Sequence, residues 1–262
     1  MRHLLPAVQQ ARPGLRRGLQ QRQQRQQQLK ADHEAAAALS LKLGKQSCKE
    51  LREAKQLACF RNGLFAHDLA FLGRLCSELA TLESLKLQEE PALHDGLPRL
   101  LEGLSAGTLP AVTTLVIADM TVGDAGASAL SNALGQGALP RLKDLSLTAA
   151  IGDAGLVALA PALRRLPALE SLDVAGNPFE DQGLAALVAS PPPPGAPPPT
   201  TTGPLATLKP LDLSDTNITN ASCDTLANAL KGGALTALKA LVLDGTQASE
   251  AAQAAVKQLL NH

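Results

Sequence analysis

The stretch that decides the fold runs from Leu142 to Leu163 and reads LKDLSLTAAIGDAGLVALAPAL. It opens with the pattern L-x-x-L-x-L, whose alternating apolar residues are typical of a strand with one buried face. It closes with leucines at the three- and four-residue spacing of a helix. Between the two halves stands Asp153, a residue type favoured at helix N-termini. The stretch therefore predicts a short strand, a turn and a helix of roughly 10–12 residues.

The same unit recurs along the chain. Six copies of the pattern begin 30, 30, 27, 39 and 30 residues apart. Their first, fourth and sixth residues are Leu82/Leu85/Leu87, Val112/Leu115/Ile117, Leu142/Leu145/Leu147, Leu169/Leu172/Val174, Leu208/Leu211/Leu213 and Leu238/Leu241/Leu243. The longest interval contains a Pro-rich insert at residues 190–204, which explains its extra length. One unit cannot bury both its strand and its helix, so we expect the units to stack around a shared core.

Stacked strand–helix units predict an α/β solenoid, with a curved parallel sheet on the concave face and helices on the convex face. The six repeats occupy residues 79–262. Residues 1–31 form an Arg/Gln-rich tail that is disordered or helical. Residues 32–78 form a helical N-terminal cap region, in which we expect a helix over residues 32–59 with Asp32 as its N-cap.

The joints between strands and helices also repeat. An Asp or Asn stands at each of four joints, and a Gly follows two residues later at three of them. The residues are Asp124, Asp153, Asp181 and Asn220, with Gly126, Gly155 and Gly183. Because Asp and Asn side chains accept hydrogen bonds from the first amides of a helix, we expect these four residues to cap their own helices. The glycines indicate close backbone packing.

The segment quoted above and the units in register with it resemble leucine-rich repeats of the ribonuclease-inhibitor-like class, over residues 79–262. The resemblance implies a horseshoe-like solenoid that binds other proteins. Such repeats usually carry Asn or Cys three positions after the strand. Here that position reads Glu90, Met120, Ala150, Asn177, Thr216 and Thr246. We therefore expect side-chain bonding to the turn backbone at the Asn and the two Thr, and looser turns in the second and third repeats.

Composition restricts the function classes. The chain has 24 Lys+Arg against 24 Asp+Glu and four Phe with no Trp or Tyr, which argues against general nucleic-acid binding. No apolar run is long enough to cross a membrane. Four cysteines without metal or disulfide spacing (Cys48, Cys59, Cys76 and Cys223) indicate a reducing compartment. We expect a cytoplasmic protein, although an Arg-rich, acid-poor start leaves organelle targeting open.

Catalytic and metal-binding motifs are missing from the sequence. The five histidines, at positions 3, 33, 67, 94 and 262, have neither metal-ligand spacing nor a neighbouring nucleophile. No phosphate-binding loop or nucleophile elbow occurs. We therefore expect no enzyme activity, no cofactor and no bound metal.

The candidate partner-binding residues lie at positions that point outward from the predicted strands and just beyond them. They are Lys86, Asp119, Asp144, Asp173, Asp212, Asp215 and Asp244. The aspartates gather in the later repeats and predict an acidic patch on the concave face, suited to a protein partner with a basic surface. The alternative is a solvated face without a partner. The Pro-rich insert is either a polyproline II docking segment or a tolerated loop.

These observations favour a non-enzymatic protein–protein interaction module, monomeric, that binds neither nucleic acid nor membrane. The main alternative is a regulator of a small GTPase, because the chain also resembles Ran GTPase-activating proteins, which share the repeat class. Against it, we find neither their acidic tail nor an Arg or Asn cluster suited to phosphoryl transfer. A third alternative, the recognition part of an immune-type receptor, lacks a preceding nucleotide-binding segment in this sequence.

Overall fold

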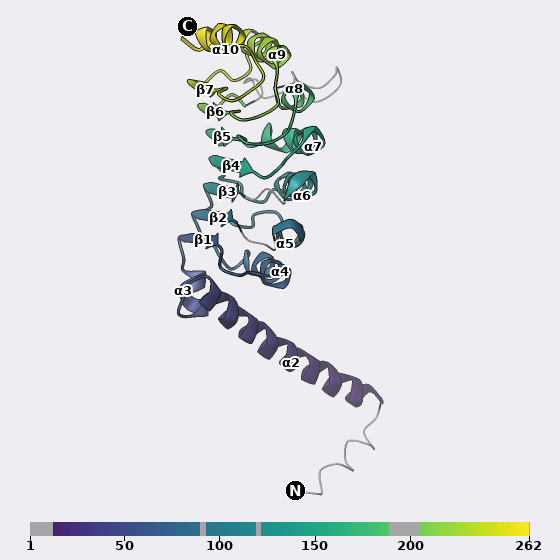
Figure 1. Cartoon of the computed structure of the whole chain (residues 1–262). Coiled ribbons are helices and arrows are strands. Elements are labelled where there is room, and N and C mark those ends of the chain that lie inside the picture. Colours follow the sequence, from purple (N-terminus) through teal and green to yellow (C-terminus); the bar gives the residue numbers. More distant parts are fainter. Residues whose placement is uncertain (1–12, 90–92, 119–121, 189–204, 262) are drawn as a thin grey trace, which may run out of the picture.

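The computed structural model of the chain describes residues 13–89, 93–118, 122–188 and 205–261. Seven short strands form one parallel sheet in chain order, so that each strand pairs with its neighbours in the sequence. They are β1 (Gln56–Phe60), β2 (Ser84–Gln88), β3 (Thr114–Ala118), β4 (Asp144–Thr148), β5 (Ser171–Asp173), β6 (Pro210–Asp212) and β7 (Ala240–Val242). Figure 1 shows them stacked along one side of an elongated solenoid, as the repeats predict.

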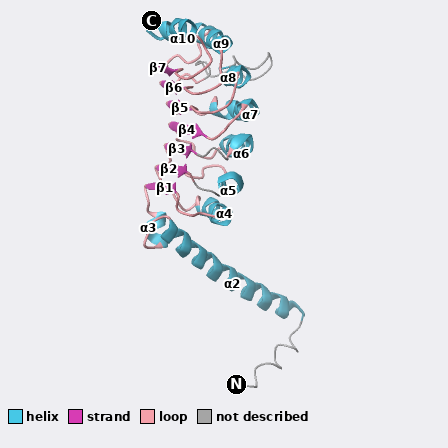
Figure 2. Cartoon of the chain, in the orientation of Figure 1, coloured by secondary structure: helices cyan, strands magenta, loops and turns pink. Residues whose placement is uncertain are grey.

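Helices cover the other side of the sheet. One follows each strand, and Figure 2 shows them in a second layer opposite the strands. They are α4 (Ala66–Leu75), α5 (Leu93–Glu102), α6 (Gly123–Gly135), α7 (Asp153–Leu163), α8 (Asp181–Val188), α9 (Asn220–Lys231) and α10 (Glu250–Gln258), the last continued by the 3₁₀ helix η1 (Leu259–Asn261). Neighbouring helices contact one another along the stack. The strand face opposite the helices is the concave face.

The core lies between the two layers and follows the repeat. The leucines in the centre of successive strands are aligned, with Leu85 opposite Leu115 and Leu115 opposite Leu145. All three side chains are at most 2% exposed. Because side chains of a strand alternate between the two faces, the residues flanking each leucine point to the concave face. The leucine pattern thus fixes which residues a partner can reach.

The chain begins its repeats one unit earlier than the sequence predicts. We expected helix over residues 32–59, but residues 56–60 form β1, which pairs in register with β2. The buried positions of this unit are filled by Ala54, Leu57 and Cys59, none more than 8% exposed. Ala and Cys stand where later repeats have leucine, valine or isoleucine, so this unit does not show the L-x-x-L-x-L pattern. The sheet therefore has seven strands, one more than the six predicted repeats would supply.

The N-terminal end of the solenoid is covered by two helices. Helix α2 (Pro13–Lys42) is continuous, so Asp32 lies inside it and is not the N-cap that the sequence predicts. Short helix α3 (Cys48–Arg52) follows and contacts α2. Ala36 and Leu39 of α2 and Leu43 just after it are buried in the core. Capping of the end is what a solenoid requires, because an uncapped end exposes its core.

The repeated aspartates do not cap their own helices, contrary to the prediction. Each instead accepts hydrogen bonds from the next repeat. Asp124 Oδ1 accepts the Gly152 amide at 2.7 Å, and Asp153 Oδ1 accepts the amides of Glu180 and Gly183 at 2.8 and 2.7 Å. The same bridge continues from Asp181 to Thr219 and from Asn220 to Ser249. These side chains therefore fasten each repeat to the following one, where they satisfy amides at the start of its helix.

The repeated glycines make room for these aspartates. A Cβ at Gly155 would lie 2.5 Å from Asp124 Oδ1, and a Cβ at Gly183 would lie 2.7 Å from Asp153 Oδ1. In the next unit Ser222 takes the corresponding place, and its hydroxyl donates to Asp181 at 2.5 Å. The close packing predicted at the glycines is thus confirmed for these two positions, and its cause is the aspartate of the preceding repeat.

The turn after the strand is bonded as predicted at its Asn and Thr positions. Asn177 is buried, and its side-chain oxygen accepts the amides of Ala149 and Ile151 at 3.1 and 2.8 Å. Its nitrogen donates to the carbonyls of Leu147 and Val174 at 2.6 and 2.8 Å. The hydroxyls of Thr216 and Thr246 donate to the carbonyls of Leu213 and Leu243 at 2.7 and 2.8 Å. Glu90, Met120 and the Pro-rich insert at 190–204 lie outside the described residues.

Candidate functional site

Three rows of side chains cross the concave face, and strand register defines them. The middle row contains Ala58, Lys86, Val116, Ser146, Asp173, Asp212 and Val242. The row before it contains Gln56, Ser84, Thr114, Asp144 and Ser171, with Pro210 and Ala240 on the last two strands. The row after it begins with Phe60, Gln88, Ala118 and Thr148. The outward positions predicted from the repeat therefore do share one face.

Asp173 and Asp212 stand side by side at the centre of the acidic part. They are register partners on β5 and β6, so their backbones are about 4.8 Å apart. Each is half-buried and accepts the amide two residues further on, Ala175 at 3.0 Å and Ser214 at 2.9 Å. Asp173 also accepts the hydroxyl of Ser146 at 2.8 Å. These bonds hold both carboxylates in fixed orientations while leaving them accessible.

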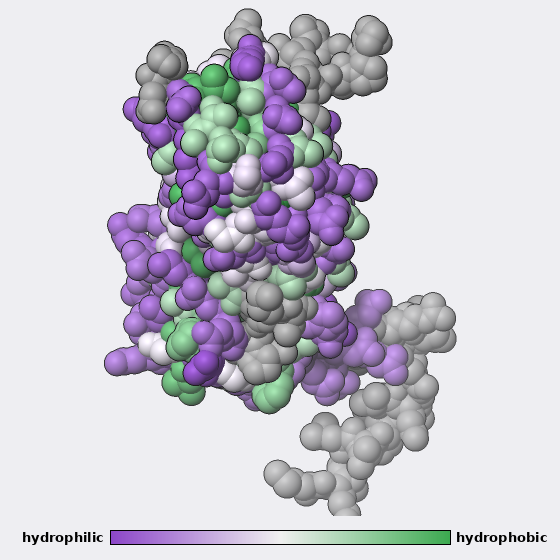
Figure 3. All heavy atoms as spheres, turned by 45° about the horizontal axis from the view of Figure 1, so that its top comes forward, coloured by the Kyte–Doolittle hydropathy of each residue, from purple (hydrophilic) through white to green (hydrophobic). Residues whose placement is uncertain are grey.

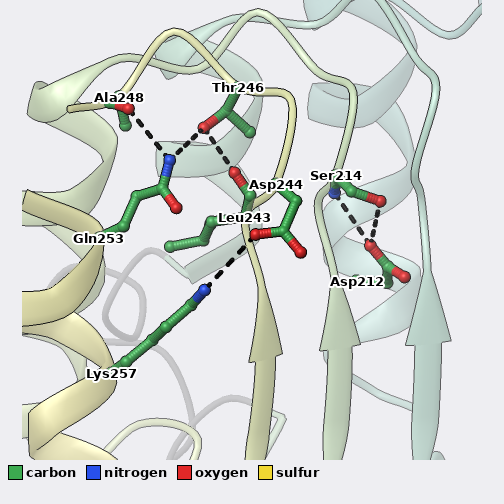
Figure 4. A network of polar contacts seen from close by, with 8 residues as sticks. All are labelled: Asp212, Ser214, Leu243, Asp244, Thr246, Ala248, Gln253 and Lys257. Carbon is green, nitrogen blue, oxygen red and sulfur yellow. Dashed lines mark hydrogen bonds and ion pairs between the residues drawn. The ribbon is translucent and has the colours of Figure 1, made fainter. Parts of the chain in front are cut away.

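Asp144, Asp215 and Asp244 complete the acidic group, and all three are exposed. Asp144 Oδ2 accepts the hydroxyl of Thr114 at 3.4 Å on the neighbouring strand. Asp244 Oδ1 lies 3.8 Å from Lys257 Nζ of α10. Figure 4 shows Asp212 of β6 near Asp244, which lies just after the neighbouring strand β7, with the Lys257 side chain approaching Asp244 from the helix. We call Asp144, Asp173, Asp212, Asp215 and Asp244 the acidic patch.

Two further candidate residues do not join the acidic patch. Lys86 is exposed on β2, two strands before the first aspartate of the patch on β4. Asp119 lies outside the described residues. The structure thus separates the concave face into an acidic half on β4–β7 and a half on β1–β3 that carries Lys86. The outward positions on strands β4–β7 include no Lys or Arg.

A charged border runs along the starts of the strands. The residue just before the strand is charged in six of the seven strands, and these residues are Lys55, Glu83, Lys143, Glu170, Lys209 and Lys239. Glu170 lies between two lysines, with oxygens 3.0 Å from Lys143 Nζ and 2.5 Å from Lys209 Nζ. Hydrogen bonds from Lys209 and Lys143, and their charges, lower the pKa of Glu170 to about 2. Glu170 thus pairs with both Lys143 and Lys209. With exposed Lys239 before β7, the border on this half of the sheet carries net positive charge and lies beside the acidic patch.

Two exposed aromatic residues lie near the β1 end of the solenoid, and only Phe60 belongs to the concave face. Phe60 is 52% exposed at the end of β1, and Phe65 is 60% exposed before α4. Arg61 lies over the Phe60 ring at 5.3 Å, and Lys42 lies over the Phe65 ring at 4.8 Å. The face in Figure 3 is mostly hydrophilic, with apolar residues gathered toward the top of the view. Aromatic residues and arginine are typical of binding hot spots. The sequence analysis did not identify Phe60 as a candidate because it did not predict β1.

The His, Cys, Asp and Glu side chains of the described residues were the candidates for metal binding and for acid–base chemistry. Among them, no group of three or more His, Cys, Asp or Glu residues is arranged to hold a metal ion. His67 lies 3.6 Å from Asp68, but Asp68 already binds Lys42 at 2.6 Å. Burial raises the pKa of the Cys76 thiol to about 12, which keeps it protonated. None of the described helices is long and apolar enough to cross a membrane.

Comparisons with known proteins agree with the repeat and the fold. A family model described as a leucine-rich repeat matches residues 166–188. The ribonuclease inhibitor of Sus scrofa is 32% identical over 143 residues, which cover 54% of this chain and 28% of that protein. The chain therefore matches under a third of its curated relative.

A solved structure supports the fold alone. A crystallised protein from Bacteroides fragilis superposes with a TM-score of 0.50 and 16% identity, over 81% of this chain and 65% of the other. The leucine spacing, the parallel sheet with one helix per strand and the match to ribonuclease inhibitor lead to the same assignment. The chain has the fold of a leucine-rich-repeat solenoid, with one segment that matches a leucine-rich repeat and 143 residues that are similar to part of ribonuclease inhibitor.

Proposed function

We propose that the chain is a non-enzymatic protein-binding module whose acidic patch receives a basic surface of a partner protein. The observation that carries the proposal is the alignment of Asp173 and Asp212 on adjacent strands, without a basic residue at the outward positions of β4–β7. The related pig protein is by its name an inhibitor of ribonuclease, so its target is a protein. That relationship supports a protein-binding role for the repeats.

The geometry of the patch favours binding over mere solubility. A carboxylate that is already oriented loses less rotational freedom when a cation binds it. Asp173 and Asp212 are oriented by amides and hydroxyls, yet they keep oxygen lone pairs free for an Arg or Lys. Charge complementarity of this kind accelerates encounter and selects the partner. A Lys- or Arg-rich helix or strand lying across β4–β7 would meet all five aspartates.

The regulator of a small GTPase, suggested by the resemblance to Ran GTPase-activating proteins, gains no support from the matched proteins and stays an untested alternative. A cytoplasmic location likewise stays a prediction.

The test uses two helical peptides of opposite charge, one rich in Lys and Arg and one with Glu in their place. Fluorescence anisotropy with the full chain should show binding of the basic peptide only. The variant D173N/D212N/D244N keeps one acceptor oxygen in each side chain and removes three charges. At about 0.2–1 kcal/mol for each exposed ion pair, it should bind the basic peptide roughly 3- to 150-fold more weakly.

The matched control is E102Q/E180Q/D224N, which removes three exposed carboxylates from other parts of the chain. It should bind the basic peptide as the unmodified chain does, apart from a small long-range effect. Equal weakening by both variants would mean that net charge, and not the acidic patch, attracts the peptide, and the proposal would then be wrong.

A further inference from the structure

The chain is neutral overall but strongly divided in charge. Residues 1–61 contain 13 Lys and Arg and 4 Asp and Glu, which gives a net charge of +9. Residues 62–262 contain 11 Lys and Arg and 20 Asp and Glu, which gives −9. Residues 1–61 are therefore basic, and residues 62–262 are acidic. Two copies attract each other when the basic end of one faces the acidic part of the other. Because the net charge of each copy is zero, the two copies have no overall charge repulsion.

Helix α2 extends the basic end away from the solenoid. Figure 1 shows it leaving the stack at β1 and pointing outward, at the end opposite to β7. The side chains of residues 20–31 are all exposed, and the neighbouring Asp32 is half-buried. Arg22, Arg25 and Lys30 form no ion pair with any described residue. A polar helix without a packing partner has little tertiary support, which leaves this segment available for a contact outside its own chain.

We propose that α2 of one copy docks on the acidic patch of a second copy. The inference rests on the proposed function, because it names the chain itself as a basic partner for that patch. Arg22, Arg25 and Lys30 supply the cations, and the glutamines between them supply amide donors and acceptors for the serines and threonines beside the aspartates. The patch on β4–β7 of the same chain lies at the far end of the solenoid from the start of α2 (Figure 1), so the contact is between molecules.

The lengths of the two surfaces agree. Arg22 and Lys30 are eight residues apart, or about 12 Å along a helix. Strands β4 and β7 are three spacings apart, or about 14 Å across the sheet. The cations of the helix therefore match the extent of the acidic patch. Because the helix of one copy contacts the face of another, two copies exchanging helices close into a dimer, and unreciprocated contacts give longer chains.

Sedimentation of the full chain tests the proposal. At about 20 mM salt the average mass should rise above the monomer mass of 27.1 kDa with increasing protein concentration, and at about 0.5 M salt it should return to the monomer value because exposed charges are screened. Two variants should each lower the association constant at least tenfold. The arm variant R22Q/R25Q/K30Q removes cations of α2, and the face variant D173N/D212N/D244N removes charges of the acidic patch. Gln has a helix propensity close to that of Arg and Lys, so α2 is preserved.

A control and a charge exchange make the result specific. The control R141Q/R165Q/K231Q removes three exposed cations outside α2 and should associate like the unmodified chain. Reversing the charge of the arm (R22E/R25E/K30E) or of the face (D173K/D212K/D244K) should abolish association. A chain with both reversals should associate again, because α2 is then negative and the patch on the concave face is positive. Circular dichroism confirms that each variant is folded.

The outcomes separate this proposal from the proposed function. An unmodified chain that stays at 27.1 kDa at all concentrations and salt levels overturns self-association and leaves the sequence-based expectation of a monomer standing. If that monomer still binds the basic peptide through Asp173, Asp212 and Asp244, the acidic patch serves a different basic protein. If association is lost equally in the control variant, it does not depend on α2, and the proposal is wrong.

Discussion

Replacing Gly155 by Ala should destabilise the solenoid, although alanine is the better helix former. A Cβ at this position would lie 2.5 Å from Asp124 Oδ1, 2.8 Å from Ile151 Cγ2 and 3.0 Å from Asp124 Cα. Asp124 must therefore move away, and its 2.7 Å hydrogen bond from the Gly152 amide is weakened or lost. Loss of a hydrogen bond to a charged group costs about 1.5–3 kcal/mol, and crowding in a packed site costs about 1–3 kcal/mol.

The gain in helix propensity offsets about 1 kcal/mol of that loss. We therefore expect G155A to reduce the free energy of unfolding by about 1.5–5 kcal/mol, measured by urea denaturation. Gly135 provides the matched control, because it ends α6 and a Cβ there would meet nothing within 4 Å. G135A should leave stability unchanged or raise it by up to about 1 kcal/mol. If G155A proved as stable as G135A, the contact between Asp124 and the following repeat would not stabilise the stack.

Three further predictions concern single residues. N177A should lower the free energy of unfolding by about 3 kcal/mol or more in urea denaturation, because it leaves buried amides and carbonyls without partners. The carboxyl of Glu170 should titrate near pH 2 by NMR; its depressed pKa stabilises the fold above the ordinary value of 4.5, and this contribution should fade as the pH falls toward 2. Cys76 should resist thiol reagents at neutral pH in the folded chain and react after unfolding, since burial raises its pKa to about 12.

The sequence was sufficient for the fold because leucine spacing reports burial directly. Each L-x-x-L-x-L unit marks which residues of a strand face the helices, and β2–β7 appear where those units stand. The unit at β1 could not be predicted because Ala54 and Cys59 fill positions that are leucine, valine or isoleucine elsewhere. Small residues fit there next to the cap, yet they carry no periodic signal strong enough to identify a strand.

The bridging aspartates show a second limit. An Asp at a helix start suggests a cap for that helix, since capping is local in sequence. Asp124 instead binds the amide of Gly152, which is 28 residues away along the chain. Only the stacking of repeats brings the two residues together. Local sequence therefore predicts correctly that the Asp binds amides at a helix start, but it predicts the wrong helix.

The candidate site was predicted in its rows but not in its details. Alternation along the strands correctly placed Asp144, Asp173 and Asp212 at outward positions on one face. The bonds that orient Asp173, from the Ser146 hydroxyl and the Ala175 amide, depend on strand register and turn geometry. Binding by these residues stays a prediction.

One measurement tests the central claim most directly, namely that the aspartates of β4–β7 form a protein-binding surface. The amides of Ala175 and Ser214 donate to Asp173 and Asp212, so their NMR resonances report on cations that approach these carboxylates. Titrating the labelled full chain with the basic helical peptide should shift both resonances progressively and saturably. If the peptide binds while both resonances stay fixed and those of α6–α9 move instead, the binding surface is the convex face and the account is contradicted.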